Sequence, residues 1–129
     1  FAPAEHVQAL LARVPRRVIV VLDEAYYEYL PDALRPDSVR LLEQHPNLVV
    51  TRTFSKAYGL AGLRVGFALA HPEICELLDR VRLPFNVNSL AQAAAVAALR
   101  DQEFVQRSRR VNEAGMRQLT RGFERLNLD

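Results

Sequence analysis

The sequence lacks features that would place it in several classes of protein. It has no tryptophan and only one cysteine in 129 residues, so neither an intrachain disulfide nor a cysteine-rich metal framework can form. No apolar run approaches the length of a membrane-spanning helix, and no signal peptide is visible. The formal net charge of +2 is too small, and the basic residues too scattered, to indicate nucleic-acid binding. We therefore expect a cytoplasmic protein that binds neither membranes nor nucleic acid.

What is present is the composition of an ordinary globular domain. Hydrophobic residues make up 50% of the chain and charged residues 25%, and the length allows one modest core. The three histidines lie far apart and show no metal-ligand spacing, so no metal site is predicted. The single cysteine, Cys75, falls in an apolar-patterned segment and is expected in the core.

The hydrophobic pattern alternates between helical and strand-like segments. Apolar residues at helical spacing predict helices over 3–14, 38–44, 72–83 and 102–126, and an alanine-rich stretch predicts one over 89–99. The apolar residues of 72–83 are expected to face inward, and those of 102–126 to form an apolar stripe opposite a solvated arginine face. Short apolar runs predict strands at 18–22, 48–50 and 65–70. The run at 18–22 is typical of a strand buried on both faces of a parallel sheet. Helix-flanked strands indicate an α/β layered domain, and three strands alone would leave exposed edges, which suggests part of a larger sheet.

The segment 51–67, TRTFSKAYGLAGLRVGF, follows one of these expected strands. It carries hydroxyl, amine and guanidinium groups at Thr51, Thr53, Ser55, Lys56 and Arg64. Alternating side chains of an extended segment can bring its hydroxyls to one side. Hydroxyls and a guanidinium bind phosphate well, and a neutral lysine amine attacks aldehydes. The pattern predicts a phosphate bound beside a reactive amine, although Ser-Lys alone would indicate only a basic surface loop.

A second polar group follows the strand expected at 18–22. Ligands of open α/β sheets collect beyond the carboxyl ends of the strands, where Asp23 is expected. An aspartate there is also typical of a helix cap or a loop. Tyr26 follows three residues later. No role is predicted for the neighbouring Glu24.

The segment around Lys56 resembles the Schiff-base region of fold-type I aminotransferases, which use pyridoxal 5'-phosphate (PLP), and most closely that of the histidinol-phosphate aminotransferases. Three stretches carry the resemblance: VIVVLDEAYYEYL at 18–30, HPNLVVTRTFSKAYGLAGLRVGFALAHP at 45–72 and VRLPFNVNSLAQAAAVAAL at 81–99. It implies a three-layer α/β/α fold with a partial, mainly parallel sheet. Residues 1–129 would form part of the PLP-binding large domain of a longer enzyme, with 102–126 a long helix leading toward the small domain.

The resemblance also implies roles for individual residues. Lys56 would form the Schiff base and act as general base and acid, which makes it the catalytic residue. The cofactor-binding residues would be Asp23, Tyr26, Thr53, Ser55, Lys56 and Arg64. Asp23 would hold the proton of the pyridine nitrogen, Tyr26 would bond the ring oxygen, and the remaining residues would anchor the phosphate. Asn86 or Asn88 could approach this site, but capping of the next helix is the favoured interpretation of Asn88 or Ser89.

The implied reaction converts L-histidinol phosphate and 2-oxoglutarate to imidazole-acetol phosphate and L-glutamate in histidine biosynthesis, in a homodimer. Aromatic-amino-acid aminotransferases and threonine-phosphate decarboxylases use a similar lysine segment, and most residues that select the substrate are expected outside this chain. A non-catalytic α/β fragment or binding module is the alternative of a different class.

Overall fold

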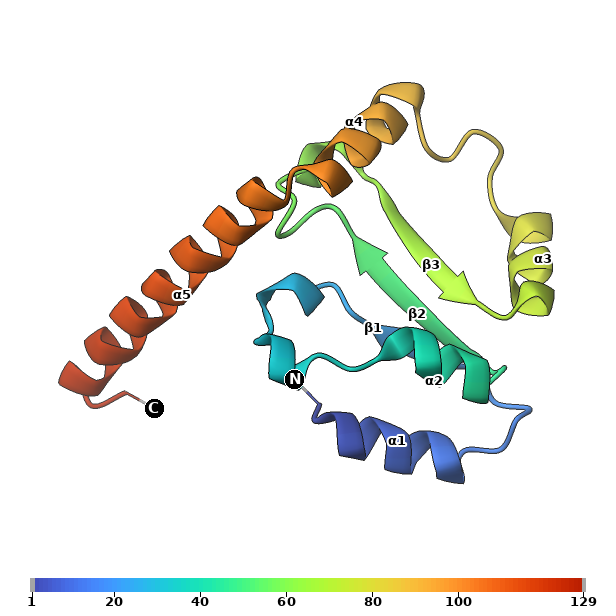
Figure 1. The fold of residues 1–129 in the computed structure, drawn as a ribbon, viewed down its shortest axis with the longest axis horizontal. Coiled ribbons are helices and arrows are strands. Elements are labelled where there is room, and N and C mark those ends of the chain that lie inside the picture. The colour runs from blue at the N-terminus through green and yellow to red at the C-terminus, as the bar shows by residue number, and fades with distance from the viewer. Residues whose placement is uncertain (1, 129) are drawn as a thin grey trace.

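The computed structural model describes residues 2–128, in which three strands and two helices are followed by three further helices (Figure 1). The helices are α1 (Ala4–Arg13), α2 (Ser38–Gln44), α3 (Pro72–Val81), α4 (Ser89–Arg100) and α5 (Gln102–Arg125). The strands are β1 (Val20–Asp23), β2 (Leu48–Thr53) and β3 (Gly66–Ala70). Single turns of 3-10 helix are η1 (Tyr27–Tyr29), η2 (Asp32–Leu34) and η3 (Ala61–Leu63). Each expected helix and strand is present, so the α/β class is confirmed; Phe1 and Asp129 lie outside the described residues.

The three strands form one sheet in the order β1-β2-β3. β1 and β2 are parallel, and Asp23 at the end of β1 is in register with Thr51 of β2. β3 runs antiparallel to β2, so parallel pairing, expected for most of the sheet, holds for one of the two strand pairs described. The physical reason lies in the connection, because between β2 and β3 the chain forms only the short turn η3, whereas a parallel crossover usually needs a full helix.

α1 and α2 cover one face of the sheet (Figure 1). The core between them and the sheet consists of Val7, Leu11, Leu41, Leu48 and Val50. Successive side chains of a strand point to opposite faces. Because Val50 faces this core, Thr51 and Thr53 face the other side of the sheet, and so does Asp23, the registered partner of Thr51. The predicted site residues on the strands therefore lie on the face opposite α1 and α2.

A second buried cluster joins the loops beyond the sheet to α4. It consists of Phe54, Val65, Ala91 and Ala95. The Asn88 side chain caps α4 by accepting a hydrogen bond from the amide of Ala91 at 2.9 Å, which confirms the capping interpretation. Asp101 then caps α5, which extends away from the sheet (Figure 1).

Three burial predictions are wrong for the described residues. Val21 of β1 is 60% exposed rather than buried on both faces, and Cys75 is exposed rather than in the core. The apolar residues of α3, and those of α5 beyond Val105, are also largely exposed. The reason is common to all three, because these side chains lie on faces that the elements within residues 2–128 leave uncovered. None of the helices described has both the length and the apolarity needed to cross a membrane.

Candidate active site

The carboxylate of Asp23 lies at the carboxyl end of β1 and is exposed on the open face of the sheet. Its Oδ1 accepts a hydrogen bond from the amide of Ala25 at 3.0 Å and one from Thr51 Oγ1 at 3.4 Å. The contact with Ala25 is the local loop interaction that any aspartate here could make. An ionised carboxylate can accept about four hydrogen bonds, so Asp23 retains the capacity to bind a cationic or N–H group of a ligand.

Lys56 and Tyr26 come together from the loops that follow β2 and β1. The ammonium Nζ of Lys56 lies 5.4 Å from the centre of the Tyr26 ring, within the range of a cation–π contact. Both side chains are exposed, and Tyr26 is 61% accessible to solvent. Tyr26 is therefore not an ordinary core tyrosine. The parallel pairing of β1 with β2 causes this meeting, because it places both carboxyl ends at the same edge of the sheet.

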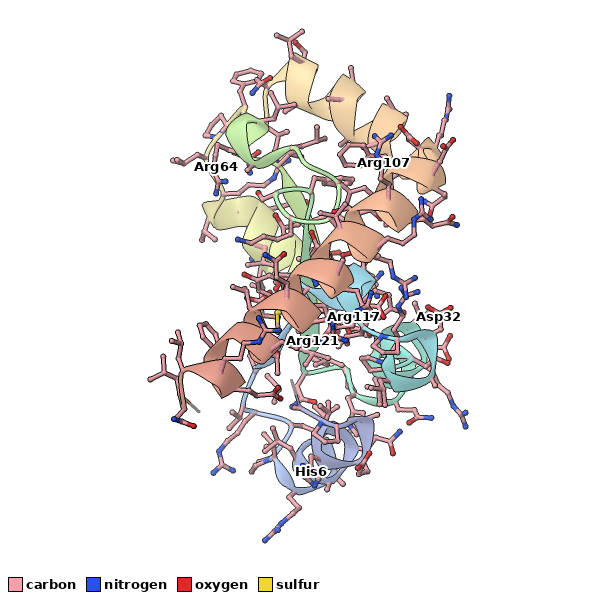
Figure 2. The ribbon with its side chains drawn as sticks, turned by 90° about the vertical axis from the view of Figure 1, so that its left-hand side faces the viewer. His6, Asp32, Arg64, Arg107, Arg117 and Arg121 are labelled. Atoms are coloured by element: carbon pink, nitrogen blue, oxygen red, sulfur yellow. The ribbon has the colours of Figure 1, made fainter. Side chains whose placement is uncertain are left out.

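Arg64 directly follows η3, and its side chain turns back toward the loop that carries Lys56. Its backbone is left-handed, with φ 52° and ψ 53°, a conformation that costs a residue other than glycine about 1 kcal/mol. Its Nη1 donates to Ser55 Oγ at 3.3 Å and to the carbonyl of Ala61 at 2.9 Å. Thr53 Oγ1 accepts from the amide of Ser55 at 3.1 Å. Figure 2 shows Arg64 beside η3, at the end of the molecule opposite His6 of α1.

The predicted residues thus form two linked groups at one edge of the sheet. The first group is Asp23 with Thr51, which are hydrogen-bonded to each other near the ends of β1 and β2. The second group consists of the hydroxyls of Thr53 and Ser55 and the guanidinium of Arg64. Lys56 directly follows Ser55 of the second group and faces Tyr26, which follows the strand end that carries Asp23. An amine between a carboxylate and an anion-binding group can attack an electrophile that carries both a basic nitrogen and a phosphate.

The family model for aminotransferases of class I and II matches residues 1–129. The chain belongs to this family. Histidinol-phosphate aminotransferase 1 of Cupriavidus pinatubonensis is 60% identical over 129 residues, which are 100% of this chain and 34% of that protein. Histidinol-phosphate aminotransferase 1 of Nitrosococcus oceani is 57% identical over 98% of this chain and 34% of that protein.

A solved structure agrees with these relatives. The crystal structure of histidinol-phosphate aminotransferase from Sinorhizobium meliloti, in complex with pyridoxal-5'-phosphate, superposes with a TM-score of 0.78 and 40% identity. The superposition covers 84% of this chain and 29% of that one. This aminotransferase-family chain spans about a third of the length of the curated relatives it matches.

Sequence reasoning missed two charged residues next to the predicted ones. Glu24 is only 6% exposed, and its Oε2 accepts hydrogen bonds from Arg52 Nε at 2.9 Å and Arg52 Nη2 at 2.8 Å. The signal that could have found this pair was strand alternation. If Asp23 and Thr51 face one side of the sheet, Glu24 and Arg52 have to face the other, where a charge is buried unless it is paired.

Tyr58, two residues after Lys56, is a titratable group whose pKa the fold raises. Burial raises the pKa of its phenol above the usual value of 10, and the nearby Glu28 carboxylate raises it further. Both causes disfavour the phenolate. The Tyr58 ring packs against Phe54 with ring centres 5.0 Å apart, so Tyr58 belongs to the support of the Lys56 loop and remains neutral under ordinary conditions.

Proposed function

We propose that this chain is the lysine-bearing segment of a PLP-dependent aminotransferase acting on L-histidinol phosphate and 2-oxoglutarate. The observation that carries the proposal is the position of Lys56. Its exposed amine faces Tyr26 from the adjacent strand end and directly follows Ser55, which accepts a hydrogen bond from Arg64.

The residues present have the chemistry that PLP requires. A phosphate takes hydroxyl and guanidinium donors. Ser55 and Arg64 supply one of each, 3.3 Å apart, and the Thr53 hydroxyl, which accepts from the Ser55 amide, supplies another beside them. A pyridine nitrogen that has to stay protonated takes a carboxylate, which Asp23 supplies on the same face of the sheet as Thr53. These four side chains, with Lys56 and Tyr26, are the residues we assign to cofactor binding: Asp23, Tyr26, Thr53, Ser55, Lys56 and Arg64.

When bound, PLP supplies an aldehyde that condenses with amines and a ring that withdraws electrons from the substrate carbon. The amine of Lys56 would hold the cofactor and would then take up and return the proton of the substrate carbon. Asp23 holds the proton at the ring nitrogen, and the Tyr26 phenol donates to the ring oxygen. Arg64, with Ser55 and Thr53, binds the phosphate and so keeps the aldehyde within reach of the amine.

The relatives support the choice of substrate. The two curated relatives and the solved structure are all named histidinol-phosphate aminotransferases, and they are 40–60% identical to this chain where they match it. The same proposal includes transfer of the amino group to 2-oxoglutarate, a homodimeric assembly and a cytoplasmic location. It also assigns the segment to the PLP-binding large domain, with α5 leading toward the small domain.

The covalent attachment of PLP tests this proposal directly. Lys56 is the only lysine of the chain, so any lysine adduct within it has one possible position. We expect borohydride reduction of the complete protein with PLP to add the cofactor's mass to the peptide that contains Lys56. Lys56→Ala should abolish the adduct, while Arg117→Lys on the exposed surface of α5 should leave Lys56 labelling unchanged.

Product analysis then separates the possible enzyme classes. Formation of glutamate from 2-oxoglutarate, dependent on L-histidinol phosphate, supports the proposed reaction. Preferential use of an aromatic amino acid, or release of carbon dioxide from threonine phosphate, would assign the site to a related enzyme. An adduct at Lys56 without turnover of these substrates would indicate a binding module, and no adduct would refute the cofactor assignment.

A further inference from the structure

The buried carboxylate of Glu24 lies on the opposite side of the chain from Asp23. Its Oε2 accepts two hydrogen bonds from the guanidinium of Arg52, at 2.9 and 2.8 Å, and its Oε1 accepts one from the hydroxyl of Ser38 at the start of α2. The Glu24 side chain is only 4% exposed and that of Arg52 21%. Glu24, Arg52 and Ser38 thus form a buried, charge-paired cluster that has no part in the proposed chemistry.

The Glu24–Arg52 pair joins the ends of the two strands that carry the candidate site. Glu24 follows Asp23 directly, and Arg52 lies between Thr51 and Thr53. The amide of Glu24 also donates to the carbonyl of Thr51 at 2.9 Å. The charged pair on one face of the sheet and the site residues on the other face therefore share the same short stretches of backbone. A movement of Glu24 or Arg52 would move the neighbouring site residues as well.

The same guanidinium fixes the loop that carries Tyr26. Arg52 lies over the Tyr27 ring, with its central carbon 3.7 Å from the ring centre. Tyr27 is the first residue of η1 and the immediate neighbour of Tyr26, whose ring faces Lys56. Arg52 thereby touches both the Glu24 carboxylate and the residue next to Tyr26, so a single side chain constrains two parts of the site.

Stability alone is a weak reason for such a pair. Removing two charges from water costs free energy, and well-packed apolar residues of similar volume often give equal or greater stability. What an ion pair with two hydrogen bonds adds is a fixed relative position of the groups it joins. The two positions joined here are the immediate neighbours of Asp23 and Thr53, whose side chains project to the opposite face.

We propose that Glu24 and Arg52 are positioning residues of the PLP site, which hold Asp23 and Tyr26 in register with the Thr53–Lys56 segment. The inference rests on the proposed cofactor site and deepens it. Neither residue touches the cofactor in this assignment. Both act through the strand ends that they join.

Two variants of the complete protein test the inference, with a matched control for loss of stability. Glu24→Gln removes the negative charge with little change of shape, and Arg52→Lys keeps the positive charge but loses the forked geometry. The control is Leu11→Ala, which weakens the core beneath the same sheet without contacting the pair. Thermal unfolding ranks the three variants by stability, and the milder Arg52→Lys keeps the test available if Glu24→Gln folds poorly.

The first measurement needs no cofactor. Amide hydrogen exchange in the PLP-free protein should accelerate in segments 23–27 and 51–56 in both pair variants, and less in Arg52→Lys than in Glu24→Gln. Leu11→Ala should not accelerate these segments selectively. Equal protection of the two segments in the pair variants and in wild type would overturn the inference.

The second measurement is the dissociation constant for PLP, obtained by titrating the cofactor into the PLP-free protein. We expect Glu24→Gln to weaken binding on the order of tenfold to a hundredfold, the size of the loss when the hydrogen-bonded partners that orient a site's binding groups are removed. Leu11→Ala should stay within about twofold of wild type.

The failure of each proposal is distinguishable. Wild-type protein that binds PLP at Lys56, together with pair variants that bind it equally well, overturns the positioning role and leaves the proposed function intact. Wild-type protein that forms no adduct at Lys56 overturns both. A loss of PLP affinity in the pair variants that merely equals the loss in an equally destabilised Leu11→Ala protein also counts against positioning.

Discussion

The replacement of Arg64 by lysine isolates the geometry of the proposed phosphate site from its charge. Both residues are cationic and neither is glycine, so the cost of the left-handed backbone at φ 52° is the same in the two proteins and cancels. What changes is the number and geometry of the hydrogen-bond donors. Arginine can bond a phosphate through two parallel N–H groups, whereas lysine offers a single point charge.

The size of the effect follows from the bonds at stake. A hydrogen bond to a charged group contributes about 1.5–3 kcal/mol, and lysine retains one of the two that arginine can make. Because Arg64 is exposed, the lower end of this range applies. About 1.4 kcal/mol corresponds to a factor of ten, so Arg64→Lys should weaken PLP binding roughly tenfold.

The assay is equilibrium titration of PLP into the complete, PLP-free protein, followed by the visible absorption of the bound cofactor. Arg117→Lys is the matched control, because Arg117 lies on α5 (Figure 2) and makes an exposed ion pair with Glu113. The control should bind PLP as wild type does. If Arg64→Lys also binds PLP with the wild-type dissociation constant, Arg64 does not clamp the phosphate and the assigned site is wrong at this residue.

Three further predictions concern the site and its support. Asp23→Asn should still bind PLP but slow turnover by roughly a hundredfold or more, because an amide cannot hold the ring proton; normal turnover in the complete protein would remove Asp23 from the mechanism. Gly66→Ala should lower the free energy of unfolding by about 1–3 kcal/mol, since its Cβ would lie 2.6 Å from the Arg52 carbonyl oxygen, whereas at Gly62 nothing lies within 4 Å. A Gly66→Ala protein that melts like Gly62→Ala would contradict that clash. The pKa of Tyr58 is raised in the folded protein, so Tyr58 stabilises the fold below pH 10 and loses this contribution as the pH rises through the folded-state pKa. Tyr58→Phe should therefore flatten the fall in melting temperature at alkaline pH. An unchanged dependence of melting temperature on pH would argue against the raised pKa.

Local pattern was sufficient to predict the elements and the residues that follow the strands. Pro72 at the start of α3 and the short apolar runs of the strands are local signals, which do not depend on the rest of the molecule. The same holds for the Asn88 cap, because at the start of a helix the capping side chain lies next to the amide three residues on. Burial was predicted less well. Val21 and Cys75 have apolar patterns, but burial requires a partner surface, which residues 2–128 do not supply at either position.

By itself, the sequence determined the α/β class, the family resemblance and the presence of an amine, a carboxylate and phosphate-binding groups after two strands. Only the tertiary structure decided that β1 and β2 end at the same edge, that Tyr26 faces Lys56, and that Arg64 turns back onto Ser55. It also decided the burial of Glu24 against Arg52. The physical reason is that each of these contacts joins residues distant in the chain, and strand pairing fixes such distances whereas local sequence does not.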